Sequence, residues 1–333
     1  MIVPRTVRVL LYPLSLLYGR IVHLRTRLYE KGWLKPKRLD STVISVGNLT
    51  VGGTGKTPMV LWLAEKFIAQ GKRVAILSRG YRGANGTSDE IELLKRRLGS
   101  RVLFGVGKDR FQAGVALASK ERVDIFLLDD GFQQLQLSRN LNILMLDGSV
   151  QLKNEWLLPA GVLREPISAC RRADILIVTR NTERPDVEAE DSRKLSIFYP
   201  QTRLLGFRLA GERKSPSDLS EIGSGPFFAF CGIGNPRAFW NDLERSRVPL
   251  AGTTEFRDHH RYTDRDLKRL ERAADQVGAK AFITTEKDEQ NLKETRLSRR
   301  PLYVAVIDFV FSSERELLAA IDRFLLGRRG AAA

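Results

Sequence analysis

The strongest local signal in the chain is Val43-Ile-Ser-Val-Gly-Asn-Leu-Thr-Val-Gly-Gly-Thr-Gly-Lys-Thr57. An apolar run leads into a glycine-rich loop, and the loop ends at an apolar helical stretch that begins with Pro58. Glycines allow backbone N–H groups to surround phosphate oxygens, and a helix N-terminus adds the positive end of a dipole. The pattern therefore predicts a phosphate-binding loop between a buried strand and a helix.

In such a loop the lysine reaches the β- and γ-phosphates of a nucleotide, and the next hydroxyl group ligates Mg²⁺. Lys56 and Thr57 are the residues at these two positions. The usual pattern begins with a glycine where this chain has Thr50, and the alternative is a glycine-rich turn that binds no nucleotide. The residues that we predict to bind ATP are Thr50, Val51, Gly52, Gly53, Thr54, Gly55, Lys56 and Thr57.

A nucleotide site of this kind also needs a carboxylate for its metal ion, at the end of another buried strand. The stretch Asp124-Ile-Phe-Leu-Leu-Asp129-Asp130-Gly131 has four apolar residues followed by two acids. Acids at a strand end also serve solubility alone. Coupled to the phosphate loop, they predict that Asp129 or Asp130 lies near Mg²⁺.

Short β-rich runs alternate with helical stretches after Asp40, which is typical of a parallel sheet covered by helices on both faces. A polar, acidic stretch over 181–200 is the best candidate for a linker, and a second alternation follows it. We predict an α/β protein: a P-loop kinase-like parallel-sheet domain over 41–200, then a second, smaller α/β domain over 201–333 that contributes to the active-site cleft. The expected strands are 42–47, 73–78, 101–106, 123–128, 141–146, 175–180, 202–209, 226–231, 280–285 and 302–308, and the expected helices are 58–70, 108–120, 165–173, 235–246, 263–277 and 313–326.

The chain of 333 residues has a net charge of +16, which calls for an anionic partner: nucleic acid, a membrane surface or a phosphorylated substrate. Residues 1–40 hold nine basic and two acidic side chains, so they carry +7 of this charge. Two cysteines without CxxC spacing exclude a disulfide framework and a cysteine zinc site, and they fit a reducing cytoplasm.

The N-terminal segment 1–40 also has an apolar stripe at helical spacing. Its longest uncharged run, 9–19, has 11 residues, whereas a spanning helix needs roughly 20. We therefore predict a basic amphipathic helix in the plane of a membrane surface, and the alternative is a helix packed on the protein and bent by Pro13. No nucleic-acid recognition motif is present. The stripe consists of Leu10, Leu14, Leu17, Ile21, Leu24 and Leu28.

Other acidic and imidazole side chains are candidates for proton transfer. His259 follows Asp258, an arrangement suited to proton handling, but Thr263 also suggests a plain loop that caps the next helix. Asp89 and Glu90 precede a helical stretch, and the leading alternative to a catalytic role is that these acids cap the helix.

Two further stretches point to a substrate. Arg79 and Tyr81 follow the second expected strand, at the same sheet edge as the phosphate loop. Arg164 and Glu165 either face an anionic substrate or cap the next helix.

Together these motifs resemble the tetraacyldisaccharide 4'-kinase family, the lipid A kinases of Gram-negative bacteria. The resemblance runs almost end to end and follows the order of the family. Thr50 at the first-glycine position is also typical of that family. The motifs are ISVGNLTVGGTGKTP, ILSRGYRG, LLDDGFQ, LNILMLD, LLPAGVLREP, FRDHHRYT and TTEKD.

The resemblance implies transfer of the ATP γ-phosphoryl group to the 4'-hydroxyl group of a tetraacylated glucosamine disaccharide 1-phosphate, with Mg²⁺, giving lipid IVA. The protein is then expected peripherally on the cytoplasmic face of the inner membrane, with no nucleic acid and no obligate protein partner. The family's Asp–His dyad maps to Asp89 and His259. The residues that we expect to bind substrate are Arg79, Tyr81, Glu90, Arg164 and Glu165.

Two departures from the family pattern stand out. The GDEP-like motif that begins with the dyad Asp has lost its Gly and Pro around Asp89, and Gln134 replaces a usual histidine. The main rival class is a membrane-tethered switch ATPase of the partitioning type, but its signature lysine is replaced by Val51. A GTPase is disfavoured because Lys287-Asp288 lacks the intervening residue of the guanine-reading motif.

Overall fold

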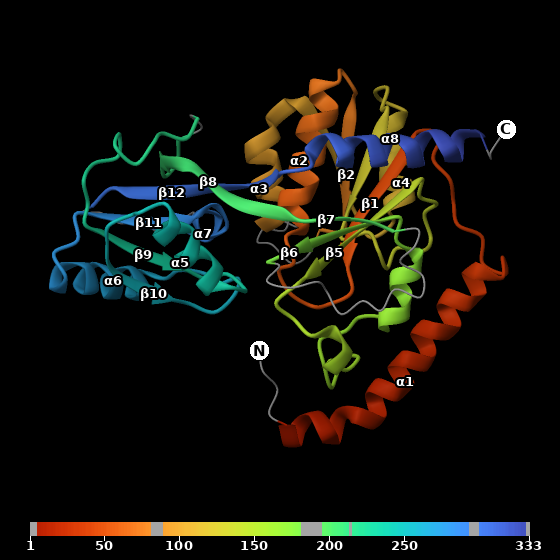
Figure 1. The fold of residues 1–333 in the computed structure, drawn as a ribbon, viewed down its shortest axis with the longest axis horizontal. Coiled ribbons are helices and arrows are strands. Elements are labelled where there is room, and N and C mark those ends of the chain that lie inside the picture. The colour runs from red at the N-terminus through yellow and green to blue at the C-terminus, as the bar shows by residue number, and fades with distance from the viewer. Residues whose placement is uncertain (1–4, 81–88, 181–194, 213–214, 293–299, 331–333) are drawn as a thin grey trace. The chain divides into compact units, whose positions relative to one another are not determined.

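The computed structural model describes residues 5–80, 89–180, 195–212, 215–292 and 300–330. Contacts divide the chain into two compact units (Figure 1). The first unit consists of Met1–Tyr81, Leu98–Gln201 and Phe311–Ala333, and the second of Arg82–Arg97 and Thr202–Val310.

This division differs from the predicted domains in two segments. Arg82–Arg97 lies within the predicted first domain but belongs to the second unit, where Arg97 pairs with Glu286 at 3.0 Å. Phe311–Ala333 returns to the first unit, where the Phe311 ring lies 4.9 Å from that of Trp62. Tertiary contacts, rather than chain order, assign both segments.

The first unit is built on a seven-stranded sheet in the order β3-β2-β4-β1-β5-β6-β7, and all its strand pairs are parallel. Every residue of β1, β2 and β4 is buried, as expected for strands covered on both faces. The strands are β1 Thr42–Asn48, β2 Val74–Ser78, β3 Val102–Val106, β4 Ile125–Asp129, β5 Leu141–Asp147, β6 Ile175–Thr179 and β7 Ser196–Phe198.

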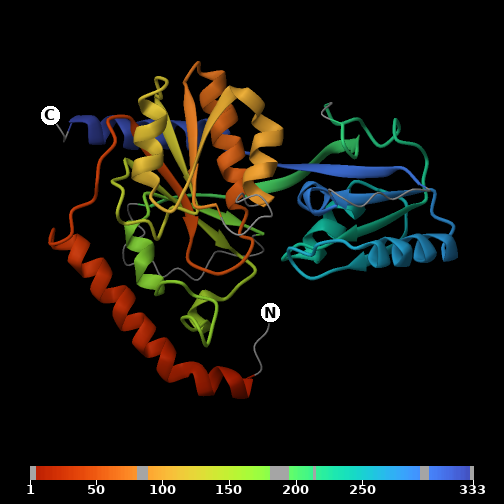
Figure 2. The same cartoon turned by 180° about the vertical axis from the view of Figure 1, so that it is seen from behind.

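Helices cover this sheet. Helix α4 packs on a cluster that includes Val43, Leu77 and Phe126 and lies in front in Figure 2, whereas α2 packs on β1 and β4. The helices of the first unit are α1 Arg5–Glu30, α2 Lys56–Ala69, α4 Arg110–Ala118 and α8 Glu314–Gly330, with 3₁₀ helices η1 Gly99–Arg101, η2 Leu152–Asn154 and η3 Ile167–Arg172.

Two expectations for this unit were wrong in detail. The helix expected over 165–173 is the 3₁₀ helix η3, which follows Pro166 and has six residues. The expected linker over 181–200 ends early, because Ser196–Phe198 pairs with β6 as the edge strand β7. Residues 181–194 lie outside the described part of the chain.

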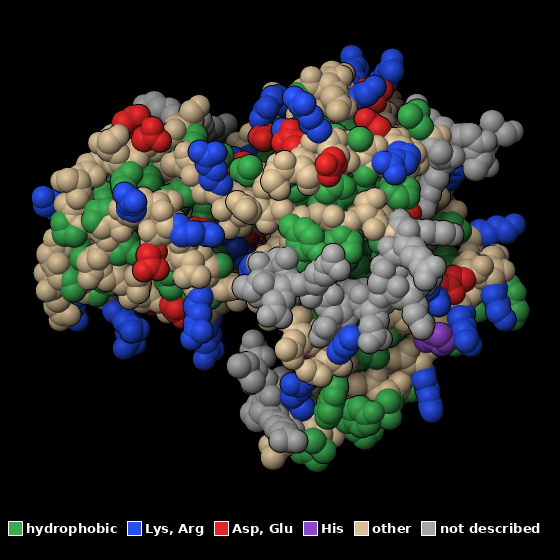
Figure 3. Space-filling model, in the orientation of Figure 1, with side chains coloured by type: hydrophobic (Ala, Val, Ile, Leu, Met, Phe, Trp, Pro, Cys, Tyr) green, Lys and Arg blue, Asp and Glu red, His purple; other side chains and the backbone are tan. Residues whose placement is uncertain are grey.

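The helix α1 presents two different faces. Its inner face binds the first unit: the Ser15 hydroxyl donates to Leu157 O at 2.9 Å, and the Tyr18 hydroxyl donates to Arg164 O at 2.8 Å. Its outer face exposes large apolar side chains, which line α1 beside basic side chains in Figure 3. The exposed members of the stripe are Leu10, Leu14, Leu17, Ile21 and Leu24, each more than half exposed.

The alternative interpretation of this segment, a helix packed on the protein, is confirmed by these contacts, and α1 also leaves its apolar stripe uncovered. Residues 9–19, the uncharged run that is too short to span a membrane, are only part of a helix of 26 residues, which is about 39 Å long. By length and composition, Thr6–Glu30 is sufficient to cross a membrane.

The second unit is built on a five-stranded sheet in the order β10-β9-β11-β12-β8. Side chains of β9 alternate: Phe227 and Cys231 join a cluster with α5, and Phe230 joins one with α6. The elements are β8 Pro200–Leu209, β9 Phe227–Cys231, β10 Leu250–Glu255, β11 Ala281–Thr285 and β12 Leu302–Phe311, with α3 Asp89–Leu98, α5 Pro236–Arg245, α6 Asp264–Gln276 and α7 Glu286–Asn291.

Two elements of this unit were missed from the sequence. Strand β10 is short and, at most positions, only partly buried, so it lacks an apolar run. Helix α7 has six residues and begins directly after β11, where the Thr285 hydroxyl caps it by accepting from Asp288 N. A helix this short has no readable hydrophobic period.

A close contact fixes the loop after β4 against β1. A Cβ atom added at Gly47 would lie 2.5 Å from the backbone nitrogen of Phe132, which follows the predicted metal-binding acids. Only glycine at this position allows the backbone to approach so closely.

We expect Gly47→Ala to lower the free energy of unfolding by about 1–3 kcal/mol, since the added methyl group must displace backbone. Denaturant unfolding of the purified protein measures this. Gly107→Ala is the matched control, because the nearest atom to its Cβ is 3.9 Å away. Equal stability of the two variants would contradict the close-approach argument.

Candidate active site

The phosphate loop occupies the turn between β1 and α2. Gly55 is the N-cap of α2 with φ of 89°, a left-handed conformation that a side chain would strain, and α2 begins at Lys56. On its other side the loop pairs with the 162–163 segment: Val51 N donates to Val162 O at 2.8 Å, and Thr50 forms an isolated bridge with Leu163.

Two residues at the end of β6 hold the loop from a third side. The Thr179 hydroxyl lies 3.3 Å from Thr54 O, and Arg180 donates to Gly53 O at 2.9 Å. Arg180 also pairs with Asp147. Sequence analysis missed this arginine, although its position at the carboxyl end of a parallel strand was the available signal.

Asp130 lies between two cations. Arg164 Nη1 is 2.7 and 2.9 Å from its two carboxylate oxygens, and Lys56 Nζ is 3.5 Å from Oδ1. Burial opposes ionisation of Asp130, but the charges of Lys56 and Arg164 outweigh it and hold the pKa of this carboxyl below its ordinary value. The predicted P-loop lysine, second acid and substrate arginine thus form one group.

The oxygen donors suit a magnesium ion. Asp129 is the last residue of β4 and 6% exposed, and Thr57 lies in the first turn of α2. A hydroxyl and a carboxylate are ligands that Mg²⁺ prefers, with phosphate and water completing its shell. Among the described residues no group of three or more His, Cys, Asp or Glu side chains is arranged as a metal site.

Arg110 is a further cation that the sequence analysis missed. It is the first residue of α4 and 6% exposed. Burial and the charge of Arg79 lower the pKa of Arg110, whereas the carboxylates of Asp130 and Asp129 raise it. This buried arginine therefore interacts electrostatically with both Asp130 and Asp129.

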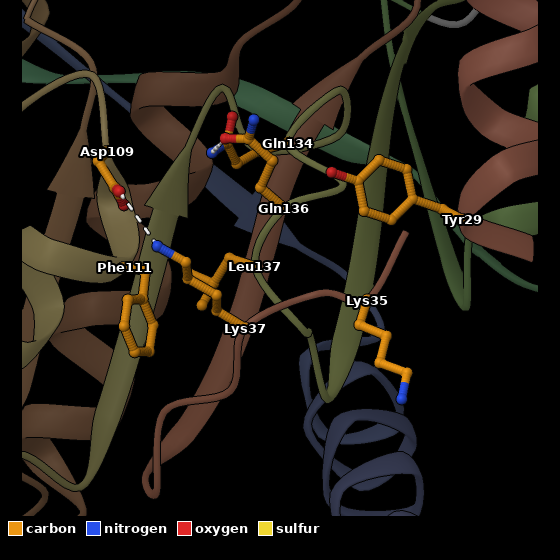
Figure 4. Close-up of a pocket in the computed structure, with 8 residues that line it drawn as sticks. All are labelled: Tyr29, Lys35, Lys37, Asp109, Phe111, Gln134, Gln136 and Leu137. Atoms are coloured by element: carbon orange, nitrogen blue, oxygen red, sulfur yellow. Dashed lines mark hydrogen bonds and ion pairs between the residues drawn. The ribbon is translucent and has the colours of Figure 1, made fainter. Parts of the chain in front are cut away.

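A separate pocket of about 250 Å³ lies in the first unit (Figure 4). Gln134, the residue that replaces the family's usual histidine, lines it and directs its amide toward Gln136 at 3.4 Å. Lys37 pairs with Asp109 across it at 3.6 Å. None of the residues predicted to bind ATP, metal or substrate lines this pocket.

The second unit brings Asp89 and His259 together. The carboxylate Oδ2 of Asp89 lies 3.0 Å from His259 Nδ1 and accepts from the Asn291 amide at 3.4 Å. The hydrogen bond to His259 is the main reason that the pKa of Asp89 is lowered, and the same bond raises the pKa of His259. Spacing along the chain left this pairing open, because the two residues lie 170 positions apart.

The two adjacent histidines have different environments. His259 has φ of 58°, a conformation uncommon outside glycine, and its backbone N–H donates to Gly232 O at 3.1 Å. His260 instead lies 3.1 Å from Asp266, which forms a capping box with Thr263. The capping interpretation therefore holds for the loop around His260, and the Asp–His pairing involves His259.

Helix α7 connects both partners of this pair. Its buried Asp288 accepts from Gly232 N at 2.7 Å and from Tyr262 at 2.8 Å, which holds the loop that carries His259. Its Glu286 pairs with Arg97 at 3.0 Å, which holds α3 and therefore Asp89. Burial raises the pKa of Asp288. The motif TTEKD marks this helix in the sequence, but nothing in the motif itself indicates these contacts.

Three of the four remaining predicted substrate residues lie within the described part of the chain. Glu90 lies 4.0 Å from His259 Nε2. Glu165 is 4% exposed and pairs with Arg172, so it is held within the protein. Arg79 is exposed at the end of β2, and Tyr81 lies outside the described residues.

Comparisons with known proteins agree on one family. A family model described as tetraacyldisaccharide-1-P 4'-kinase matches residues 7–326. The tetraacyldisaccharide 4'-kinase of Geobacter metallireducens is 38% identical, covering 96% of this chain and 99% of the relative, and that of Halothermothrix orenii is 31% identical, covering 96% and 95%. The crystal structure of an "apo" form of LpxK from Aquifex aeolicus in complex with ATP has a TM-score of 0.76 at 30% identity, covering 96% of this chain and 99% of that one.

The Asp89–His259 contact has a measurable consequence for charge. Since the Asp89 carboxylate stabilises the imidazolium form, Asp89→Asn should lower the pKa of His259. Titration followed by NMR of the imidazole signals measures this, with His259→Gln used to assign the resonance. An unchanged pKa in Asp89→Asn would mean that the two side chains do not interact in solution.

Proposed function

The chain belongs to the tetraacyldisaccharide-1-P 4'-kinase family, and we propose that it transfers the γ-phosphoryl group of ATP to the 4'-hydroxyl group of a tetraacylated disaccharide 1-phosphate, giving lipid IVA. The observation that carries this proposal is the pair of charge arrangements: Lys56 and Arg164 around Asp130 in one unit, and Asp89 bonded to His259 in the other. Phosphoryl transfer requires positioned cations and a proton acceptor more than covalent chemistry.

On the ATP side, the backbone of residues 50–57 would surround the phosphates and Lys56 would contact them. Mg²⁺, held by Thr57 and by Asp129 or Asp130, would neutralise phosphate charge.

On the acceptor side, Asp89 is the proposed proton acceptor. Its Oδ2 receives the hydrogen bonds of His259 and Asn291, which leaves Oδ1 to face the acceptor hydroxyl. The proton of the sugar hydroxyl would pass to Asp89 while the oxygen attacks the γ-phosphorus and its bond to the ADP oxygen breaks. Arg79, Tyr81, Glu90 and Arg164 are the proposed contacts of the lipid substrate, whereas Glu165 is buried against Arg172 and is no longer proposed as one.

We further propose that α1 lies in the plane of the cytoplasmic face of the inner membrane, as a peripheral attachment. Its inner face makes polar contacts to the protein through Ser15 and Tyr18, and its outer stripe is apolar. Arg20 and Arg25 are exposed on the same helix, where an interface accepts their charges and a hydrocarbon core does not. Neither nucleic acid nor an obligate protein partner is part of this proposal.

The partitioning-type switch ATPase is not favoured. Family membership points to a metabolic kinase, and Val51 stands where the signature lysine of those ATPases would be.

The kinase proposal is tested with Mg-ATP and the lipid disaccharide dispersed in detergent. We expect a labelled lipid product, and we expect Asp89→Asn and His259→Ala each to lower kcat by ~10²–10⁴ with ATP binding kept. His260→Gln is the matched control, since its ring pairs with Asp266 instead. Absence of product from the wild-type protein would contradict the kinase assignment. Full turnover by Asp89→Asn would show that Asp89 is not the proton acceptor.

The membrane proposal is tested by flotation with anionic liposomes. Replacing Leu14, Leu17 and Ile21 together by serine removes three apolar side chains that are each more than half exposed. Each is worth roughly 1 kcal/mol on insertion, so partitioning should fall roughly 100-fold. The matched control is Val115→Ser with Val277→Ser, 41% and 42% exposed on other elements. Equal flotation of both variants would contradict the proposal that α1 lies in the membrane surface.

A further inference from the structure

Lys287 is a charged residue of α7 to which no role has been given so far. Its neighbours Glu286, Asp288, Glu289 and Gln290 are all buried, so the backbone that carries it is fixed. Its own side chain is 22% exposed and reaches the loop that contains His259. Nζ donates to Asp258 Oδ1 at 2.7 Å and lies 3.3 Å from His259 Nε2.

The second of these contacts favours one tautomer of the neutral imidazole. A lysine ammonium group has three donors and no acceptor, so His259 Nε2 must offer its lone pair at this distance. The proton of the neutral ring then lies on Nδ1, which faces Asp89 Oδ2. A proton on Nε2 would instead place two donors, one of them charged, against each other.

Four charged groups face the imidazole. Asp89 and Glu90 come from α3, Asp258 from the loop of His259 itself, and Lys287 from α7. The three carboxylates favour the imidazolium form, and Glu90 and Asp258 lie 4.0 Å from Nε2, where they would attract a proton. Lys287 is the group among these four that opposes protonation.

We propose that Lys287 is the positioning residue of the Asp89–His259 pair: its ammonium group, anchored by Asp258, opposes protonation of His259 and keeps the proton of the neutral ring on Nδ1. His259 then donates to Asp89 Oδ2, and Asp89 keeps its other oxygen available to the acceptor hydroxyl. The role of the pair in catalysis rests on the proposed function, whereas the effect of Lys287 on the imidazole does not.

The direct test is the protonation of His259 in the wild-type protein and in Lys287→Met. Nitrogen-15 shifts of the wild-type imidazole above its pKa should show the proton on Nδ1, and a proton on Nε2 would overturn the proposal without any variant. In Lys287→Met the pKa of His259 should rise, because a cation is removed beside it. An unchanged pKa and tautomer in the folded variant would also overturn it.

Turnover gives a second readout. The acidic limb of the kcat–pH profile should move to higher pH in Lys287→Met. The kcat at neutral pH should fall roughly 10- to 100-fold, by analogy with the loss of a side chain that orients a metal-ligating histidine. The KM for ATP should stay the same. Lys287→Arg keeps the cation and should restore the wild-type profile, at least in part.

The matched control is Lys280→Met, which removes an exposed lysine of the same unit just before β11. Its pH profile and His259 titration should equal those of the wild type. A profile that moves equally in Lys280→Met and Lys287→Met would reduce the effect to net charge and contradict the proposal. If no variant and no wild-type sample turns over, the kinase proposal fails, and the NMR titration still decides the role of Lys287.

Discussion

The parallel pairing of β1 with β4 is the constraint on which the first unit depends. In this register Val46 lies opposite Asp129, so the phosphate loop and the two acids leave the sheet at the same edge. Gly47 then lets the backbone at Phe132 approach β1, which holds the loop after Asp130 close to Lys56. A shift of one residue in this pairing would turn every side chain of β1 to the other face and separate these groups.

Helix α7 has the corresponding position in the second unit. A six-residue helix is marginal by itself, and its stability here comes from burial and from partners on several sides. Glu286 pairs with Arg97, Asp288 accepts from Gly232 and Tyr262, and Lys287 reaches His259. Buried carboxylates cost free energy unless they are paired, so these contacts must form together. One short helix therefore sets the distance between Asp89 and His259.

Much of the first sheet could be predicted from the sequence, because fully buried parallel strands read as continuous apolar runs. Strands β1, β2 and β4 lie within two residues of their expected bounds. Strand β10 and helix α7 could not be predicted, since a partly buried strand and a six-residue helix have no readable period. The assignment of α3 to the second unit was equally invisible, because it depends on an ion pair between residues 189 positions apart.

The sequence by itself determined the glycine-rich turn after β1 and the acids at the end of β4, since each is a local motif whose residues lie within one short stretch of the chain. It also determined the apolar stripe of α1, whose helical period requires no partner. The tertiary structure decided which face of α1 is covered, how closely Asp89 and His259 approach each other, and where Lys287 points. These depend on contacts between distant segments, where packing and charge pairing select one geometry from many that local propensity allows.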